Sequence, residues 1–156
     1  MRNSYVILLL VLFTGLASCD KNRVYQQAYD FDDTGWNVDT LPSFTFDIDD
    51  TQPKNLLLNL RYGLDYKEYN IYLKYDLLDS IGNELASELI SIDLFDPKTG
   101  RPLGEGNSIY QNQLPVLENY RFTRPGSYTF RVAQYTRENP AMEVYSVGIR
   151  VEEVGQ

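Results

Sequence analysis

Short apolar segments alternate with turn-forming clusters along almost the whole chain, and this alternation limits the possible folds more than any other feature. Clusters containing Gly, Pro, Asn or Asp stand at 33–35, 51–53, 81–83, 96–100 and 124–126, and these residue types favour tight turns. The segments between them predict strands at 24–31, 44–48, 56–62, 69–77, 89–95, 118–122, 128–134 and 145–151. Only 80–88 is compatible with a helical turn. This pattern favours an all-β fold, a single-domain antiparallel β-sandwich of about eight strands.

Two of these segments alternate apolar and polar residues with the period of a half-buried strand. The residues that share a face are Tyr69, Ile71, Leu73, Tyr75 and Leu77 in the first segment, and Tyr145, Val147, Ile149 and Val151 in the second. The 13 tyrosines of the chain agree with this assignment, because aromatic side chains suit a pleated, half-buried surface.

The start of the chain is typical of an export signal that ends at Cys19. Arg2 supplies a positive charge, 6–13 is an unbroken apolar run, and 16–19 (Leu-Ala-Ser-Cys) has the spacing of a bacterial lipobox, in which the cysteine receives a diacylglycerol and the chain is cut just before it. A membrane-spanning helix over 5–17 would reach only about 20 Å, against a hydrocarbon core of about 30 Å. An ordinary secretory signal would leave the single cysteine unpaired, an oddity that lipidation removes.

The expected organisation is a signal peptide at 1–18, a lipidated N-terminus and short tether at 19–23, and a β-sandwich domain at 24–156. The residues between Cys19 and the first strand reach about 15 Å at ~3.5 Å per residue, so the domain stays close to its membrane. Two or three acyl chains are enough for stable anchoring. Apart from this covalent lipid on Cys19, no cofactor is expected.

The charge balance and the missing histidine exclude several classes of function. A net charge of −8 argues against nucleic acid as a partner, which needs a concentrated positive field, and against direct adhesion to anionic lipid. Without histidine, a Ser-His-Asp triad and a histidine-bound zinc are excluded. Asp47 and Asp49 could form a hydrolytic pair or hold Ca²⁺, but acidic residues beside Thr51 and Pro53 are typical of a solvated turn. The sequence therefore predicts no catalytic residue, no metal ligand and no small-molecule substrate.

Two aromatic residues are candidates for stacking on sugar rings. Tyr72 falls on the polar face of its strand, and Trp36 lies in a loop beside Gly35 and Asn37. The favoured alternative for Trp36 is a plug over one end of the sandwich, with its large apolar area buried and its N–H bonded to the backbone. For Arg61 a half-buried ion pair with a carboxylate is favoured over a ligand clamp.

Two segments are candidates for binding a protein partner. Residues 96–112 form the longest stretch without strand periodicity, and long loops in small domains are often functional. Arg101, Glu105 and Tyr110 are its candidate contact residues. The alternative is that its glycines only permit a tight path. The second segment is 134–142, with Gln134 and Arg137 as candidates.

These residues together resemble the gliding-motility lipoprotein GldH family. The resemblance covers nearly all of the chain after Cys19 and is carried, in order, by Trp36, Phe44-x-Phe46, Arg61, Tyr66 with Asn70-x-Tyr72-Leu73, Asp96-Pro97-x-x-Gly100 with Leu103-Gly104-x-Gly106 and Ile109-Tyr110, Phe122-x-x-Pro125-Gly126-x-Tyr128-x-Phe130, Gln134-x-x-Arg137 and Val147-Gly148-x-Arg150. The segment Tyr135-Thr136-Arg137 departs from the family, which more often has small and methionine residues there.

The resemblance implies a non-enzymatic lipoprotein of the Gram-negative envelope that is needed for gliding and for the associated type IX protein secretion. Such a protein is expected to act as a structural or assembly component through contacts with other gliding and secretion lipoproteins. Family members also occur in bacteria that do not glide. The mixed charges of 20–23 lack the acidic cluster of surface-exported lipoproteins, which favours the periplasmic face of the outer membrane. The rival hypothesis is a polysaccharide-binding accessory lipoprotein that uses Trp36 and Tyr72.

Overall fold

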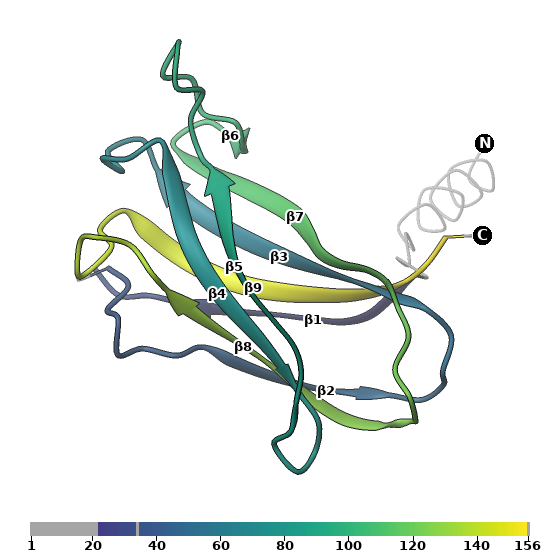
Figure 1. The fold of residues 1–156 in the computed structure, drawn as a ribbon. Helices are drawn as coiled ribbons and strands as arrows, with labels where there is room; N and C mark the ends of the chain where they lie inside the picture. The colour runs from purple at the N-terminus through teal and green to yellow at the C-terminus, as the bar shows by residue number, and fades with distance from the viewer. Residues whose placement is uncertain (1–21, 34, 156) are drawn as a thin grey trace, which may run out of the picture.

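The computed structural model describes residues 22–33 and 35–155, which form nine β-strands and no helix. The strands are β1 (Arg23–Asp30), β2 (Ser43–Ile48), β3 (Lys54–Gly63), β4 (Asn70–Leu78), β5 (Glu84–Asp93), β6 (Glu105–Gly106), β7 (Ile109–Tyr120), β8 (Gly126–Gln134) and β9 (Val144–Glu153) (Figure 1). Within the described ranges, no helix is long and apolar enough to cross a membrane.

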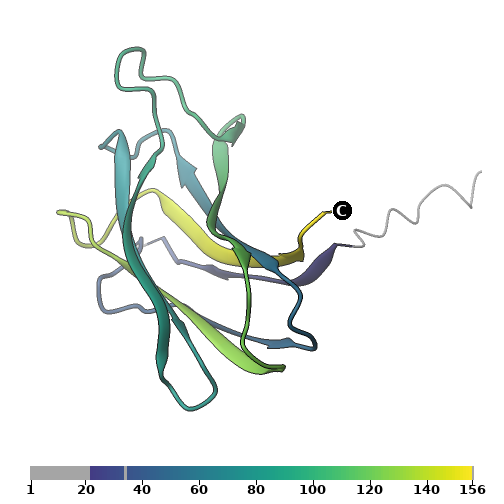
Figure 2. The ribbon, with the colours of Figure 1, turned by 45° about the vertical axis from the view of Figure 1, so that its right-hand side comes forward.

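The strands form two antiparallel sheets that pack face to face (Figure 2). One sheet has the order β1-β9-β3-β7-β6, and the other has the order β2-β8-β4-β5. Strands next to each other in a sheet are mostly distant in sequence, as in β-sandwiches with crossing connections. The predicted class, an all-β antiparallel sandwich, is confirmed.

The core lies between the sheets and consists of the inward residues of each strand. Leu56, Leu58 and Leu60 of β3 alternate with half-buried residues, and their partners on β9 are Val151, Ile149 and Val147. On the opposite sheet, Tyr75 stacks on Phe130 with ring centroids 5.2 Å apart. The alternation predicted for 69–77 and 145–151 is therefore the alternation of the core, with Tyr69 and Tyr145 at the strand ends outside it.

Two strand predictions were wrong. The segment 109–120 is a twelve-residue strand, β7, whereas the sequence analysis placed 109–112 in a loop and a strand at 118–122. Pro115 within β7 is tolerated because only the two-residue β6 pairs on the outer side of β7, so the missing N–H costs little there. The segment 84–88 belongs to β5 rather than to a helical turn, and the turn before it is held by Asp79, whose carboxylate accepts from the backbone N–H of Ile81 and Asn83.

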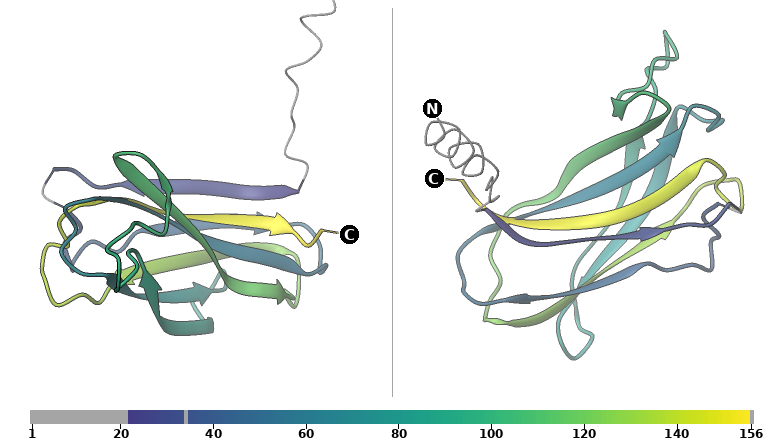
Figure 3. Two further views of the ribbon diagram at one scale, coloured as in Figure 1. Left: turned by 90° about the horizontal axis from the view of Figure 1, so that it is seen from above. Right: turned by 180° about the vertical axis from the view of Figure 1, so that it is seen from behind.

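The two ends of the sandwich differ in what they carry. At the proximal end, Asn22 accepts a hydrogen bond of 2.7 Å from the Glu153 amide, so the described N-terminus lies beside the end of β9 (Figure 3). The β2–β3, β4–β5 and β7–β8 connections share this end. At the distal end lie the β1–β2, β3–β4, β5–β7 and β8–β9 connections. Cys19 and the whole predicted signal peptide lie outside the described residues.

A buried lysine joins two strands at the proximal end. Lys54 has 2% of its side chain exposed, and its Nζ lies 2.6 Å from Asp50 Oδ1 and 3.0 Å from Glu153 Oε2. Burial lowers the pKa of Lys54, but the hydrogen bonds with the two carboxylates outweigh it and raise the pKa above the ordinary value. Lys54 therefore stays charged and holds the start of β3 to the end of β9.

Candidate functional site

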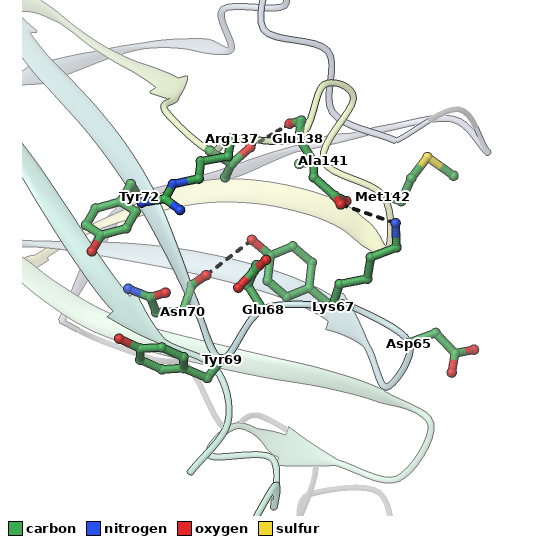
Figure 4. A pocket seen from close by; sticks show the side chains of 12 residues that line it. Asp65, Lys67, Glu68, Tyr69, Asn70, Tyr72, Arg137, Glu138, Ala141 and Met142 are labelled. Carbon is green, nitrogen blue, oxygen red and sulfur yellow. Dashed lines mark hydrogen bonds and ion pairs between the residues drawn. The ribbon is translucent and has the colours of Figure 1, made fainter. Parts of the chain in front are cut away.

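A groove of about 200 Å³ opens at the distal end between the β3–β4 and β8–β9 connections. Its lining residues come from both connections and from the start of β4: Asp65, Tyr66, Lys67, Glu68, Tyr69, Asn70, Tyr72, Thr136, Arg137, Glu138, Ala141 and Met142 (Figure 4). The start of β1 lies at the opposite end of the sandwich from the groove.

Aromatic side chains form one wall of this groove. Tyr69 and Tyr72 are 49% and 45% exposed, so part of each ring is open to a ligand in the groove. Tyr66 is half-buried, and its hydroxyl donates to the Asn70 carbonyl at 3.3 Å. Burial, together with the charges of Glu68 and Glu138, raises the pKa of Tyr66 to about 12. Tyr66 is therefore a protonated donor that supports the wall.

The opposite wall is the β8–β9 connection, which is fixed from two sides. Lys67 Nζ lies 3.2 Å from Glu138 Oε1, an ion pair that joins the two connections. Gln134 Oε1 accepts hydrogen bonds from the backbone N–H of Thr136 at 2.8 Å and from its hydroxyl at 2.6 Å. The exposed ion pair contributes little stability by itself. The hydrogen bonds to the buried side-chain amide of Gln134 therefore hold most of this connection in place.

The polar groups over the groove are suited to a ligand with both apolar faces and hydrogen-bonding groups. Arg137 is exposed and directed towards Tyr72 (Figure 4), and no ion pair holds its guanidinium among the residues that the structure describes. Asn70 Nδ2 donates to Ser91 Oγ at 2.7 Å on the outer face of the sheet. Stacking on the tyrosine rings combined with hydrogen bonds from an arginine would fit an extended peptide or a sugar chain.

Trp36 is not available for stacking on a surface ligand. It is fully buried, its ring stacks on Phe31 at a centroid distance of 4.8 Å, and its Nε1 donates to the Thr40 carbonyl at 2.9 Å. The plug interpretation is confirmed, and Trp36 as a glycan-stacking residue is corrected. Trp36 and Ala141 also exchange two backbone hydrogen bonds, of 3.0 and 2.9 Å, so the plug lies directly behind the groove wall.

The partner-binding candidates separate into two groups. Arg101 and Glu105 are exposed in the β5–β7 connection, and Tyr110 is half-buried, with its ring 6.0 Å from that of Tyr62. In the second group, Arg137 lies at the groove while Gln134 is only 1% exposed. Gln134 is therefore corrected from a contact residue to a supporting one, because its amide is used inside the protein.

The glycines of the β5–β7 connection have a structural role at two positions. Gly100 has a φ of 68° and Gly106 a φ of 151°, conformations that favour glycine. The carboxylate of Asp96 accepts hydrogen bonds from the Lys98 and Thr99 amides and from the Thr99 hydroxyl. Hydrogen bonds from Thr99 and Lys98 hold the pKa of Asp96 below its usual range. The path of this connection is thus set by turn chemistry.

The remaining candidates of the sequence analysis are not part of a site. Arg61 is exposed on the outer face of β3, and no half-buried ion pair forms around it within the described chain. Asp47 and Asp49 are both exposed, and no group of acidic residues that could hold a metal is found among the described residues.

Comparison with known proteins identifies the family. The model of the GldH lipoprotein family matches residues 23–151. The chain is 28% identical over 162 residues to a protein of Christiangramia forsetii described as a gliding motility lipoprotein GldH homolog, covering 97% of this chain and 98% of that one. It is also 28% identical over 166 residues to the gliding motility lipoprotein GldH of Flavobacterium johnsoniae, covering 98% of each chain. The protein belongs to the GldH lipoprotein family.

Solved structures are more distant. A protein of Sulfurospirillum deleyianum is 8% identical, with a TM-score of 0.45, and the match covers 85% of this chain and 99% of that one. A likeness this distant carries no information on function.

Proposed function

We propose that this protein is a non-enzymatic, lipid-anchored component of the gliding machinery and the associated type IX secretion apparatus, and that it works through contacts with other envelope lipoproteins. The observation that carries the proposal is the family match over 23–151, together with two relatives, matched over nearly their whole length, that are described as a gliding motility lipoprotein or a homolog of one. Cys19 is the proposed site of lipid attachment, after removal of 1–18 as a signal peptide.

The proposed location is the periplasmic face of the outer membrane. The start of β1 lies at the proximal end of the sandwich, so a lipid on Cys19 would direct this end to the membrane. The distal end, with the groove and the exposed Arg101 and Glu105, would then project away from the membrane towards other proteins. This arrangement suits an assembly component. The distal end carries the exposed aromatic side chains of the groove, and it is the end that stays accessible to other proteins when the domain is anchored.

Anchoring is tested by metabolic labelling in the native host. The wild-type chain should incorporate radiolabelled palmitate and sediment with the outer membrane, whereas Cys19→Ala should do neither. Equal labelling of both chains would refute the lipidation site. A Ser18→Ala variant serves as the matched control, because it keeps the cysteine and the small residue before it.

The contact surface is tested by site-specific photo-crosslinking in cells, followed by mass spectrometry. A photo-reactive residue at Arg101 or Arg137, at the distal end, should capture other envelope lipoproteins. The same residue at Ser80, at the proximal end, should capture far less of them. If Ser80 captures the same partners as the distal positions, or if neither distal position captures an envelope lipoprotein, the distal surface is not the contact surface.

The second candidate function is polysaccharide binding, which the exposed Tyr69 and Tyr72 beside Arg137 favour. A glycan array with the mature protein separates the two hypotheses. Glycan binding that is lost in Tyr72→Ala, with an unchanged melting temperature, would support the sugar hypothesis over the protein-contact one. Turnover of any peptide, ester or glycan would overturn the non-enzymatic assignment.

A further inference from the structure

Strand β5 is a long sheet edge, and within the described residues no strand pairs with its outer side. It is the last strand in the order β2-β8-β4-β5 and pairs only with β4 among the described residues. Its ladder with β4 is regular from Asn70↔Asp93 to Leu77↔Ala86. An edge of this length presents a row of backbone donors and acceptors to which another strand can bind.

Three hydrogen bonds determine which residues of β5 face the open side. Leu94 N donates to Tyr69 O, and Tyr135 N donates to Tyr72 O. The Asp93 carbonyl accepts from Asn112 Nδ2 and so points away from β4. Because backbone groups in an antiparallel ladder alternate between the two sides, the N–H and C=O groups of Ser87, Leu89 and Ser91 point to the open edge.

The other edges of the sandwich are blunted by their backbone, whereas the main protection of β5 is the charge of Glu88 on its inner face. The ladder of β7 with β3 has two register shifts, and β7 contains Pro115. The β1 edge has a register shift between Arg23 and Tyr25, and β2 has only 6 residues. Proline, bulges and short length are the usual devices that prevent strand addition. β5 has 10 residues, no proline and no lysine, and its only register shift is at its start, between Leu77 and Leu78 of its partner.

The side chains along this edge define what a bound strand must offer. On the outer face, Leu89 is 56% exposed. On the inner face, Ala86 and Ile90 are half-buried against the core, with Glu88 between them. The Tyr75 hydroxyl lies 3.2 Å from both Glu88 Oε2 and the Val116 carbonyl. An added strand would therefore place apolar side chains opposite Ala86 and Ile90, and a cation opposite Glu88.

We propose that β5 is a docking edge for an extended strand of another envelope protein, which binds antiparallel and carries a lysine or arginine opposite Glu88 between two apolar residues. A second copy of this chain does not fit this chemistry. β5 has Glu84, Glu88 and Asp93 but no cation, so every symmetric pairing of β5 with β5 places Glu88 opposite a carboxylate or an apolar side chain. Cross-strand pairs of like charge are destabilising, and pairs of opposite charge are favourable.

The proposal is tested with a fluorescent peptide, Thr-Val-Leu-Lys-Thr-Val-Thr, and the full-length lipoprotein in detergent micelles. In the antiparallel register, the peptide places its lysine opposite Glu88 and its two valines opposite Ala86 and Ile90. We expect saturable binding by fluorescence polarisation. Replacing the lysine of the peptide by glutamate should weaken binding about fivefold, the effect of one cross-strand charge pair. The variant Glu88→Lys should reverse this preference.

Two proline variants separate strand addition from loss of folding. Leu89→Pro removes an N–H that faces the open edge of β5, keeps the ladder with β4, and should weaken peptide binding about tenfold or more. Asp47→Pro is the matched control. The Val132 N–H donates to the Pro42 carbonyl at 2.9 Å, which places the Asp47 N–H on the open side of β2. This control should bind the peptide like the wild type.

Several results would overturn the proposal. The first is that the peptide shows no saturable binding. The second is that Leu89→Pro binds the peptide as tightly as the wild type does. The third is that adding the peptide does not slow the hydrogen exchange of the Ser87, Leu89 and Ser91 amides. A dimer that Leu89→Pro disrupts would instead assign the edge to a second copy. The inference builds on the protein-contact part of the proposed function, but peptide binding is measured without motility. Failure of the edge and failure of the gliding assignment are therefore distinguishable.

Discussion

Trp36 should be one of the largest single contributors to the stability of the distal end. Its side chain is fully buried, stacks on Phe31, and donates a hydrogen bond to the Thr40 carbonyl. Truncation of a buried tryptophan to alanine costs about 3–5 kcal/mol, through lost transfer energy and the cavity left behind. Trp36→Ala should lie in the lower half of that range, because the connections around the ring can partly collapse into the space.

The magnitude is large enough to measure by thermal unfolding. For a domain of this size, 1 kcal/mol corresponds to a few degrees, so Trp36→Ala should lower the melting temperature by about 10–15 °C. Trp36→Phe keeps a stacked ring and loses the N–H donor, so its cost should be about 1 kcal/mol. Since Trp36 is the only tryptophan of the chain, far-UV circular dichroism is the probe that works for all three proteins.

The same experiment distinguishes the plug from a binding residue. An unchanged melting temperature in Trp36→Ala would refute the plug argument. Trp36 and Ala141 are joined through their backbones, so loss of the ring should also loosen the groove wall. This would appear as faster hydrogen exchange of 135–143 in Trp36→Ala than in Trp36→Phe.

Three further substitutions test contacts within the two sheets. Asp76 is buried, and although burial raises its pKa, hydrogen bonds from Arg131, Lys74 and Ser87 outweigh it and hold the pKa below the ordinary value. Its contribution to stability is therefore complete above about pH 5 and is lost as the pH falls through the lowered pKa. Asp76→Asn should lose about 1–3 kcal/mol at neutral pH and show a weaker acid dependence in urea titrations. Gly148→Ala should lower the melting temperature, because a Cβ there would meet the Gln27 carbonyl oxygen of β1 at 2.6 Å. Lys54→Met should cost less than Lys54→Ala in the same titrations, since the methionine fills the buried volume and leaves only carboxylates that solvent reaches.

The parts of the fold that follow from period-two alternation were predictable. The expected strand at 69–77 differs by one residue at each end from β4, and the strand expected at 145–151 lies inside β9. In both strands one face is apolar because it is fully buried between the sheets. β7 was missed because its inward residues, Tyr110, Leu114 and Val116, are only half-buried at the sheet edge, so the selection for apolar residues at alternate positions is weak there.

The candidate site was less predictable than the fold. The groove joins 65–72 with 136–142, and nothing in a single sequence says which loops meet at one end of a sandwich. A local signal existed in the three tyrosines Tyr66, Tyr69 and Tyr72, close together in one stretch. Gln134 was misassigned because a buried glutamine and an exposed one look alike in sequence. What distinguishes it is the pair of hydrogen bonds from Thr136.

The open edge and the groove are joined at the end of β5. The Leu94 and Phe95 amides both donate to the carbonyl of Tyr69, at 2.8 and 2.9 Å, so the end of the docking edge holds the aromatic wall of the groove. A partner strand on the open side of β5 would have to continue past Phe95 and around the β3–β4 connection to reach the groove, and such a partner would occupy both surfaces. If one partner does so, the loss of binding free energy in the double variant Leu89→Pro with Arg137→Glu should be smaller than the sum of the losses in the two single variants. The reason is that either change alone releases the same strand. If the two surfaces bind separate partners, the two changes should act independently, as distant sites do.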